Sequence, residues 1–388
     1  MVAASLAAAC GQGGGGATAS HPGPTALATP RPTPYRIDGI YDRLTDEQKV
    51  GQLLMVGLSS SDGSPPAVAD AVTNHHVGGV VLYGTGWDSA QRVRLATAAL
   101  QAMATQPATG GMPLYVAGNQ EGGQHGSFQA FYGSGFQDIP AALDQGRMAP
   151  VRLEYWALDW GQELAGAGVN LDLAPVMDTV PPGQDASNQP VGAPRRELGH
   201  DPADVASHGA AFVRGMEAAG ESVAVKHFPG LGRVTGNTDL TASGTSDSAA
   251  TADDPYLRPF RAGWQAGAQM VMVSLANYPG IDPDNLAAFS AIVITRLLRG
   301  RLGFRGLVIS DDLGATAAVQ GVSPGDRATR FVRAGGDIVL TVRPDDVGPM
   351  AAAMLALMRE DAALRSQVAA SVHRVIRAKL EAGLLPAG

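Results

Sequence analysis

Two segments of the sequence place charged side chains directly after short apolar runs, where strands would end. Asp311 follows the run 307–310, and Lys226 and His227 follow the run that begins at Ser222. Cleavage of a glycosidic bond needs a carboxylate at the anomeric carbon and a second group that protonates the departing oxygen. Asp311 fits the first role. A buried lysine such as Lys226 needs an anion or a sugar hydroxyl as its partner.

Further polar side chains follow other apolar runs. Asn119 and Glu121 stand in the segment Asn-Gln-Glu-Gly-Gly, whose glycines would let a ligand approach the backbone closely. Asp178 follows another run. By strand alternation, Asp312 should point away from the site and accept backbone hydrogen bonds, unless it and its neighbour cap a helix. Each residue alone could be a solvated loop position, but their recurrence after successive runs favours one shared site.

Apolar runs of four to six residues without alternation are typical of parallel strands buried on both faces. After Tyr35 the chain contains eight such runs, with loops and Ala-rich amphipathic stretches between them. We expect strands at residues 53–58, 79–83, 114–117, 169–174, 222–226, 270–274, 307–310 and 337–341. We expect helices at residues 90–104, 203–219, 255–266 and 326–334, and one or two closing helices between about 351 and 384.

This alternation predicts an α/β protein, specifically a (β/α)8 TIM barrel in a single catalytic domain over residues 35–388. An open doubly wound sheet is the alternative. Its dinucleotide-binding form is disfavoured because no Gly-x-Gly-x-x-Gly follows the first strand. In a barrel, functional residues lie just after the carboxyl ends of the strands. The polar residues named above should therefore meet at one rim.

Residues 1–34 have a different composition from the rest of the chain. They are rich in Gly, Ala, Ser, Thr and Pro, and we expect a flexible tether because such a segment buries too little surface to fold. Cys10, the single cysteine, follows Leu6-Ala-Ala-Ala and resembles the lipidated cysteine of a bacterial lipobox, although Leu6 lies one residue too far away. We therefore expect an extracytoplasmic protein, lipid-anchored or secreted. The alternative is a chance cysteine in an ordinary terminus.

The overall composition excludes several functional classes. The chain has 388 residues, a formal net charge of −8 and no run of like charges, so nucleic acid is not an expected partner. No apolar stretch reaches the roughly 18 to 20 residues that cross a bilayer. His75, His76 and His125 lack partners at zinc-binding spacing. We expect no metal, no cofactor and a monomer.

Six collinear motifs resemble those of glycoside hydrolase family 3, in particular its single-domain NagZ-like β-N-acetylhexosaminidases. The resemblance implies a TIM barrel, a retaining mechanism through a glycosyl-enzyme intermediate, and action on terminal β-linked N-acetylglucosamine, often from peptidoglycan fragments. It implies that Asp311 is the nucleophile. It also implies that Lys226, His227 and Arg196 bind substrate hydroxyls. The full set of expected substrate-binding residues also includes Asn119, Glu121, Asp178 and Asn237. The motifs are residues 51–57, 120–123, 170–178, 226–230, 303–306 and 310–313.

The sequence departs from this family where the acid/base should stand. The NagZ-like pattern has Asp-Ser-His, but here the stretch ends Asn237-Thr-Asp239, so the expected histidine is missing. Asp239 could be the acid/base if its environment raises its pKa and if it stands about 5 to 5.5 Å from Asp311. Asn237 could then orient it.

Substrate binding is also altered, because the family's Asp, Arg and His are Asn119, Gln124 and Leu275 here. Three functions remain open. The first is an exo-acting retaining β-glycosidase that uses Asp311 and Asp239. The second is a surface lipoprotein with impaired catalysis that binds glycans or a protein partner. The third is a β-glycosidase or phosphorylase of different sugar specificity.

Overall fold

The computed structural model describes residues 34–60 and 65–386. Cys10 and all of the expected tether except Pro34 lie outside the described residues. No helix within the described ranges combines the length and apolar character needed to cross a membrane.

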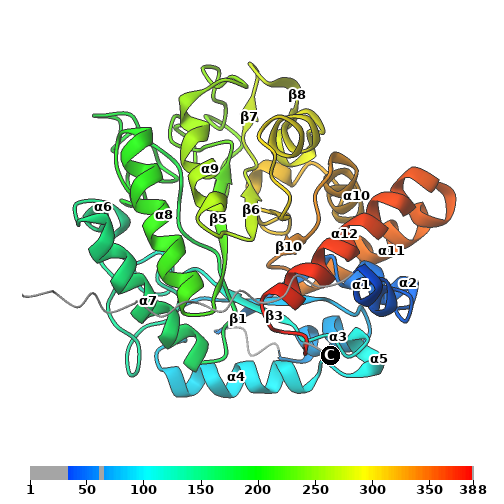
Figure 1. Cartoon of the computed structure of the whole chain (residues 1–388). Coiled ribbons are helices and arrows are strands. Elements are labelled where there is room, and N and C mark those ends of the chain that lie inside the picture. The colour runs from blue at the N-terminus through cyan, green and yellow to red at the C-terminus, as the bar shows by residue number, and fades with distance from the viewer. Residues whose placement is uncertain (1–33, 61–64, 387–388) are drawn as a thin grey trace, which may run out of the picture. The chain divides into compact units, whose positions relative to one another are not determined.

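Eight parallel strands form a sheet that curls into a barrel (Figure 1), which confirms the predicted (β/α)8 architecture. Hydrogen-bonded neighbours run in the order β10-β1-β2-β3-β4-β5-β6-β9, and a bridge between Ile309 and Ile338 connects the two ends of this order. The strands are β1 (Leu54–Ser59), β2 (Gly79–Tyr83), β3 (Tyr115–Gly118), β4 (Leu171–Asp172), β5 (Ser222–Phe228), β6 (Met270–Val273), β9 (Leu307–Ser310) and β10 (Val339–Thr341).

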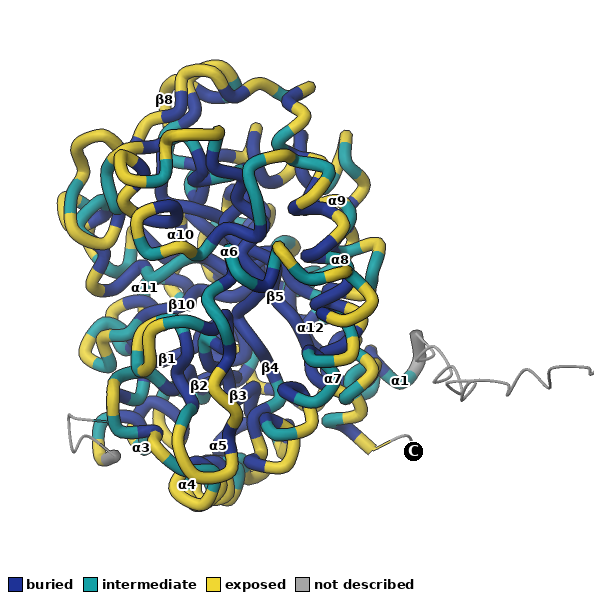
Figure 2. The backbone as a smooth tube through the Cα atoms, turned by 90° about the vertical axis from the view of Figure 1, so that its left-hand side faces the viewer, coloured by how far each residue is buried: buried dark blue, intermediate teal, exposed yellow. Residues whose placement is uncertain are grey.

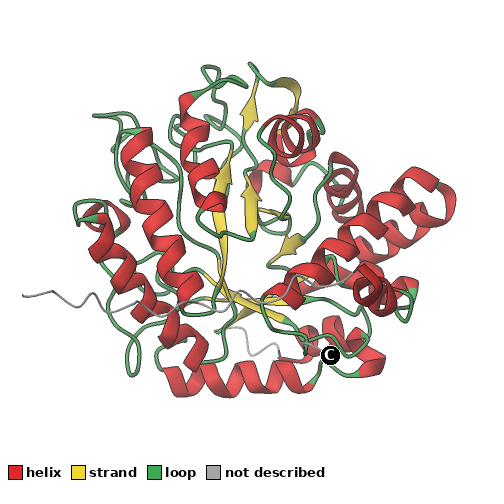
Figure 3. Ribbon diagram, viewed as in Figure 1, coloured by secondary structure: helices red, strands yellow, loops and turns green. Residues whose placement is uncertain are grey.

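Helices surround the barrel (Figure 3). Local signals set their starts: Asp201 accepts the Ala203 N–H at 2.7 Å and Pro202 opens the helix that follows. The α-helices are α1 (Pro34–Tyr41), α2 (Asp46–Gly51), α3 (Pro65–Thr73), α4 (Ala90–Ala102), α5 (Gln106–Thr109), α6 (Ala142–Gln145), α7 (Pro150–Gly166), α8 (Pro202–Ala218), α9 (Arg258–Gln265), α10 (Pro324–Ala334), α11 (Pro344–Glu360) and α12 (Ala362–Glu381). The short 3-10 helices are η1 (Pro255–Leu257), η2 (Ala287–Phe289) and η4 (Ala317–Val319).

The barrel strands are buried along nearly their whole length (Figure 2), as their continuous apolar runs predict. β5 shows this best, because all seven of its residues are buried, including the charged Lys226 and His227 at its carboxyl end. Burial on both faces requires a partner for each of these polar groups, and this requirement shapes the site described below.

One insertion between strands was not predicted. After β6 the chain forms an antiparallel pair, β7 (Asn277–Tyr278) and β8 (Asp282–Leu286), and then the π-helix η3 (Ile292–Arg301) before it reaches β9. The sequence around β8 reads Asp-Pro-Asp-Asn-Leu, which has no strand-like alternation. The closing helices also begin earlier than expected, at Pro344.

Candidate active site

The candidate site is a cavity of about 410 Å³ at the carboxyl-terminal rim of the barrel. Its wall takes residues from strand ends and from the loops that follow them, as expected for a TIM barrel. Seven of the predicted site residues line it: Asn119, Arg196, Lys226, His227, Asn237, Asp239 and Asp311. Glu121 and Asp178, which we also expected to bind substrate, are absent from the wall and lie behind it.

Asp311 lies immediately after β9, where its backbone N–H donates to the Val273 carbonyl at 3.1 Å. One of its carboxylate oxygens accepts the Asp312 N–H at 2.9 Å. Burial raises the pKa of Asp311, the nearby His227 lowers it, and the negative charge of Asp239 raises it again. The net direction is upward, so the folded protein stabilises this carboxylate less than water does.

Asp312 accepts backbone hydrogen bonds, as expected, but it also lines the cavity, whereas strand alternation predicts that it points away from the site. Its carboxylate accepts the N–H groups of Gly314 at 2.9 Å, Ala315 at 2.7 Å and Val342 at 2.8 Å. These bonds join the turn after β9 to the end of β10. Asp312 therefore stabilises the backbone of the turn that contains Asp311.

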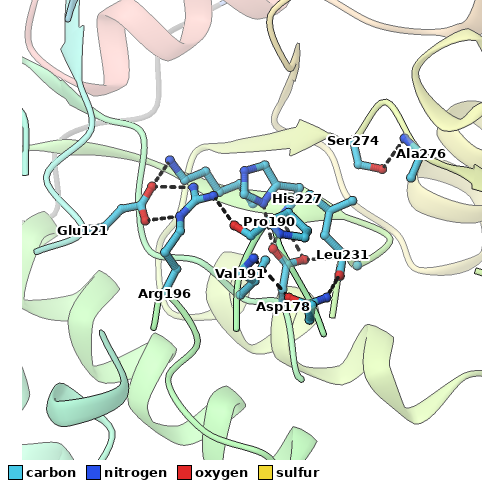
Figure 4. Close-up of polar contacts among 12 residues, drawn as sticks. Glu121, Asp178, Pro190, Val191, Arg196, His227, Leu231, Ser274 and Ala276 are labelled. Atoms are coloured by element: carbon cyan, nitrogen blue, oxygen red, sulfur yellow. Dashed lines mark hydrogen bonds and ion pairs between the residues drawn. The ribbon is translucent and has the colours of Figure 1, made fainter. Parts of the chain in front are cut away.

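Glu121 lies behind the cavity wall and holds two cations of that wall (Figure 4). Its two oxygens accept from Arg196 Nε and Nη2, both at 2.8 Å, and Oε1 also lies 2.6 Å from Lys226 Nζ. Burial by itself would raise the pKa of Glu121, but Arg196 and Lys226 together lower it to about 2. The expected substrate-binding role of Glu121 is thus replaced in the structure by a positioning role.

The two cations have further contacts on the cavity side. Lys226 Nζ donates to Asn119 Oδ1 at 3.0 Å. The Arg196 guanidinium lies 4.5 Å from the centre of the Phe128 ring and donates to the Pro190 carbonyl at 2.8 Å. Phe128 and Pro190 line the cavity but carry no sequence signal that would have selected them.

Asp178 positions His227 in the same manner (Figure 4). Asp178 Oδ2 lies 2.7 Å from His227 Nδ1, and the carboxylate accepts the backbone N–H of Leu231 at 2.8 Å. An imidazole whose Nδ1 faces a carboxylate keeps its Nε2 free for a ligand. The peptide bond between Lys226 and His227 is cis. Asp178 is fully buried, so it acts on a substrate only through His227.

Asp239 reaches the cavity from the loop after β5. Its carboxylate accepts from Thr316 Oγ1 at 3.3 Å, and its carbonyl accepts the Ala317 N–H at 3.2 Å. Asn237 Oδ1 accepts the backbone N–H of Asp239 at 3.0 Å. Asn237 therefore stabilises the turn, and Thr316 contacts the carboxylate itself. The sequence predicts that Asn237 orients Asp239, but it gives no signal for Thr316, because only the folded chain brings Thr316 near.

Arg233 anchors the start of this loop. Its Nε lies 2.8 Å from Asp247 Oδ2, it also pairs with Asp254, and its guanidinium stacks 4.2 Å from the centre of the Tyr256 ring. The loop that carries Asp239 is thus held at its base by ion pairs and at its tip by the segment after Asp311.

Comparison with known proteins gives concordant matches. The model of the glycosyl hydrolase family 3 N-terminal domain matches residues 45–378. A β-hexosaminidase of Xylella fastidiosa (strain M12) is 34% identical over 322 residues, covering 80% of this chain and 90% of the relative. The crystal structure of a β-N-acetylhexosaminidase from Beutenbergia cavernae DSM 12333 has a TM-score of 0.83 and 47% identity, covering 87% of this chain and 98% of that one. A family 3 β-N-acetylglucosaminidase from Paenibacillus sp. str. FPU-7 has a TM-score of 0.76 and 28% identity, covering 88% and 63%.

Proposed function

The chain belongs to glycosyl hydrolase family 3, and we propose that it removes terminal β-linked N-acetylglucosamine or a closely related sugar from cell-wall glycans. The observation that carries this proposal is the placement of Asp311 after β9 in a cavity that also holds Lys226, His227 and Arg196. The names of the related hexosaminidases support the choice of sugar.

The proposed reaction is a double displacement with retention. In the first step the Asp311 carboxylate attacks the anomeric carbon, the glycosidic bond breaks, and Asp239 donates its proton to the departing oxygen. In the second step Asp239 takes a proton from water, which attacks the anomeric carbon and releases Asp311. Thr316 supports this assignment, because its hydroxyl donates to Asp239 Oδ1 at 3.3 Å and so fixes the carboxyl group in the cavity.

Sugar hydroxyls are proposed to bind Lys226, His227 Nε2 and Arg196. The first two are held by buried carboxylates, which limits their motion and reduces the entropy lost on binding. Asn119 adds an amide to this wall. Since an amide both donates and accepts, it can contact a hydroxyl without a charge.

We also propose that the enzyme acts outside the cytoplasm, anchored through Cys10. Support comes only from the lipobox-like segment and the Gly/Pro-rich stretch behind it. Expression of the full chain and of Cys10→Ser in a bacterial host, with labelled palmitate, tests this. Label and membrane association that vanish in the variant are expected; an unlabelled wild-type chain would overturn the anchor.

Trapping of the glycosyl-enzyme tests the catalytic proposal. We expect a 5-fluoro β-N-acetylglucosaminyl fluoride to add one sugar to the peptide that contains Asp311, as read by mass spectrometry, and no label in Asp311→Asn. Turnover of 4-nitrophenyl β-glycosides and muropeptide fragments is measured in parallel. Label on another residue would remove Asp311 as nucleophile, whereas saturable glycan binding without any product would replace the enzyme by a binding protein.

A further inference from the structure

Away from the catalytic cavity, the long loop between β4 and α8 gathers three potential metal ligands. They are Asp185, Glu197 and His200, and one ligand atom from each lies within 4.8 Å of the others. His200 Nδ1 is 3.5 Å from Asp185 Oδ1. None of the three lines the catalytic cavity.

Glu197 is the buried carboxylate of this cluster. Its side chain has 0% exposure, and over residues 34–60 and 65–386 neither of its carboxylate oxygens has a hydrogen-bond partner. Asp185 Oδ1 is likewise buried without a hydrogen bond in the same ranges. The nearby cation Arg195 is already paired with Asp144 at 2.6 Å. The Asp185 side chain is 40% exposed, but its buried Oδ1 lies close to the fully buried Glu197. Two carboxylates side by side in such a place need a proton or a metal cation between them.

We propose that Asp185, Glu197 and His200 bind one divalent transition-metal ion, with Zn²⁺ as the ion that fits this donor set best. Two carboxylates and an imidazole match zinc, whereas Mg²⁺ and Ca²⁺ prefer oxygen ligands alone. His200 Nδ1 lies 3.1 Å from the Val180 carbonyl, a hydrogen bond that ion binding through Nδ1 would replace, and a water would supply the fourth position.

The loop that carries these ligands is already organised by Asn188, which is buried. Asn188 Nδ2 donates to the carbonyls of Leu231 and Val234, both at 2.7 Å, and Oδ1 accepts the N–H groups of Val191 at 3.1 Å and Gly192 at 2.7 Å. A loop fixed in this way loses little entropy when its side chains bind an ion.

The bound ion would stabilise the loop between β4 and α8. Because this loop also carries residues of the catalytic cavity, the ion would affect substrate binding. Arg196 directly precedes Glu197, and Pro190 lies between Asp185 and Glu197; both line the cavity. An ion that joins the two ends of this loop therefore fixes the position of Arg196. We expect bound Zn²⁺ to raise Tm and to lower KM, with little change in kcat.

Metal titration of the chelator-treated full chain tests this site. Calorimetry with Zn²⁺ should give a single ion per chain, and Co²⁺ should give a visible d–d spectrum that changes in His200→Gln. Glu197→Gln and His200→Gln should each weaken binding at least about tenfold.

Two controls separate this site from other carboxylates. Glu217→Gln replaces a half-buried glutamate outside the cluster, and Asp311→Asn removes a carboxylate that lines the catalytic cavity. Both should keep the ion. Absence of Zn²⁺ binding to the wild-type chain, or binding that Asp311→Asn abolishes and Glu197→Gln leaves intact, would overturn the proposal.

Discussion

Replacement of Glu121 by Gln tests whether one buried carboxylate positions both cations of the cavity wall. Arg196 and Lys226 lower the pKa of Glu121 from 4.5 to about 2, and each pKa unit corresponds to about 1.4 kcal/mol, so its ionisation contributes about 3–4 kcal/mol to folding. Removal of one member of a buried ion pair generally lowers the free energy of unfolding by about 3–5 kcal/mol, which agrees with this value. We therefore expect Glu121→Gln to lower the free energy of unfolding by about 3–4 kcal/mol at pH 7.

The stability difference between wild type and Glu121→Gln should depend on pH. Because the pKa of Glu121 in the folded chain is lower than in the unfolded chain, the contribution is fully present above about pH 5 and is lost as the pH falls toward 2. The difference between wild type and Glu121→Gln should therefore shrink as the solution is acidified below pH 5. Urea unfolding followed by circular dichroism at several pH values measures it.

Glu217→Gln is the matched control for this experiment. Burial raises the pKa of Glu217 to about 8, so this side chain is already neutral at pH 7 and its replacement should change stability little. KM should rise in Glu121→Gln, because Lys226 and Arg196 lose their common negative charge. A Glu121→Gln protein within about 1 kcal/mol of wild type and with unchanged KM would refute the positioning role.

Three further predictions concern Asp178, Asp239 and the buried Lys379. Asp178→Asn removes the negative charge that faces His227 Nδ1 and should lower kcat/KM about 10- to 100-fold with unchanged Asp311 labelling; an unchanged kcat/KM would contradict the role of Asp178. Asp239→Asn removes a negative charge that raises the pKa of Asp311, so the acid limb of kcat/KM on an activated aryl glycoside should move to lower pH, and a limb that stays in place would argue against this coupling. Burial lowers the pKa of Lys379 to about 7, so wild-type stability should rise between pH 7 and 10; Lys379→Met should lack this rise, and an equal rise in both proteins would assign it to other groups.

The sequence predicts the barrel because each strand carries its own signal. The run 79–83 coincides with β2 and the run 307–310 with β9. β4 is shorter than its run 169–174, since only Leu171 and Asp172 pair as a strand before the chain turns at Pro175. The β7–β8 pair was missed because its strands lie outside the barrel and their polar residues carry no periodic pattern.

The site residues were located by their position after strands, but their roles depend on neighbours far away in the sequence. Glu121 and Asn119 both follow the same predicted strand. The Glu121 side chain binds Arg196, which is 75 residues away in the sequence, and therefore does not line the cavity. Thr316 has no signal of its own. Asp185, Glu197 and His200 likewise escaped notice, because their spacing matches no known zinc motif.

The amide at position 119 also follows from the charge balance of the wall. Lys226 and Arg196 share a single carboxylate, Glu121, so the three side chains carry one excess positive charge beside the cavity. The family's aspartate at this position would cancel that charge and, as a second anion near Asp311, would raise its pKa further. Asn119 still accepts the Lys226 hydrogen bond at 3.0 Å and adds no negative charge. The substitution therefore favours an ionised Asp311 in the cavity that Asp311 shares with Asp239.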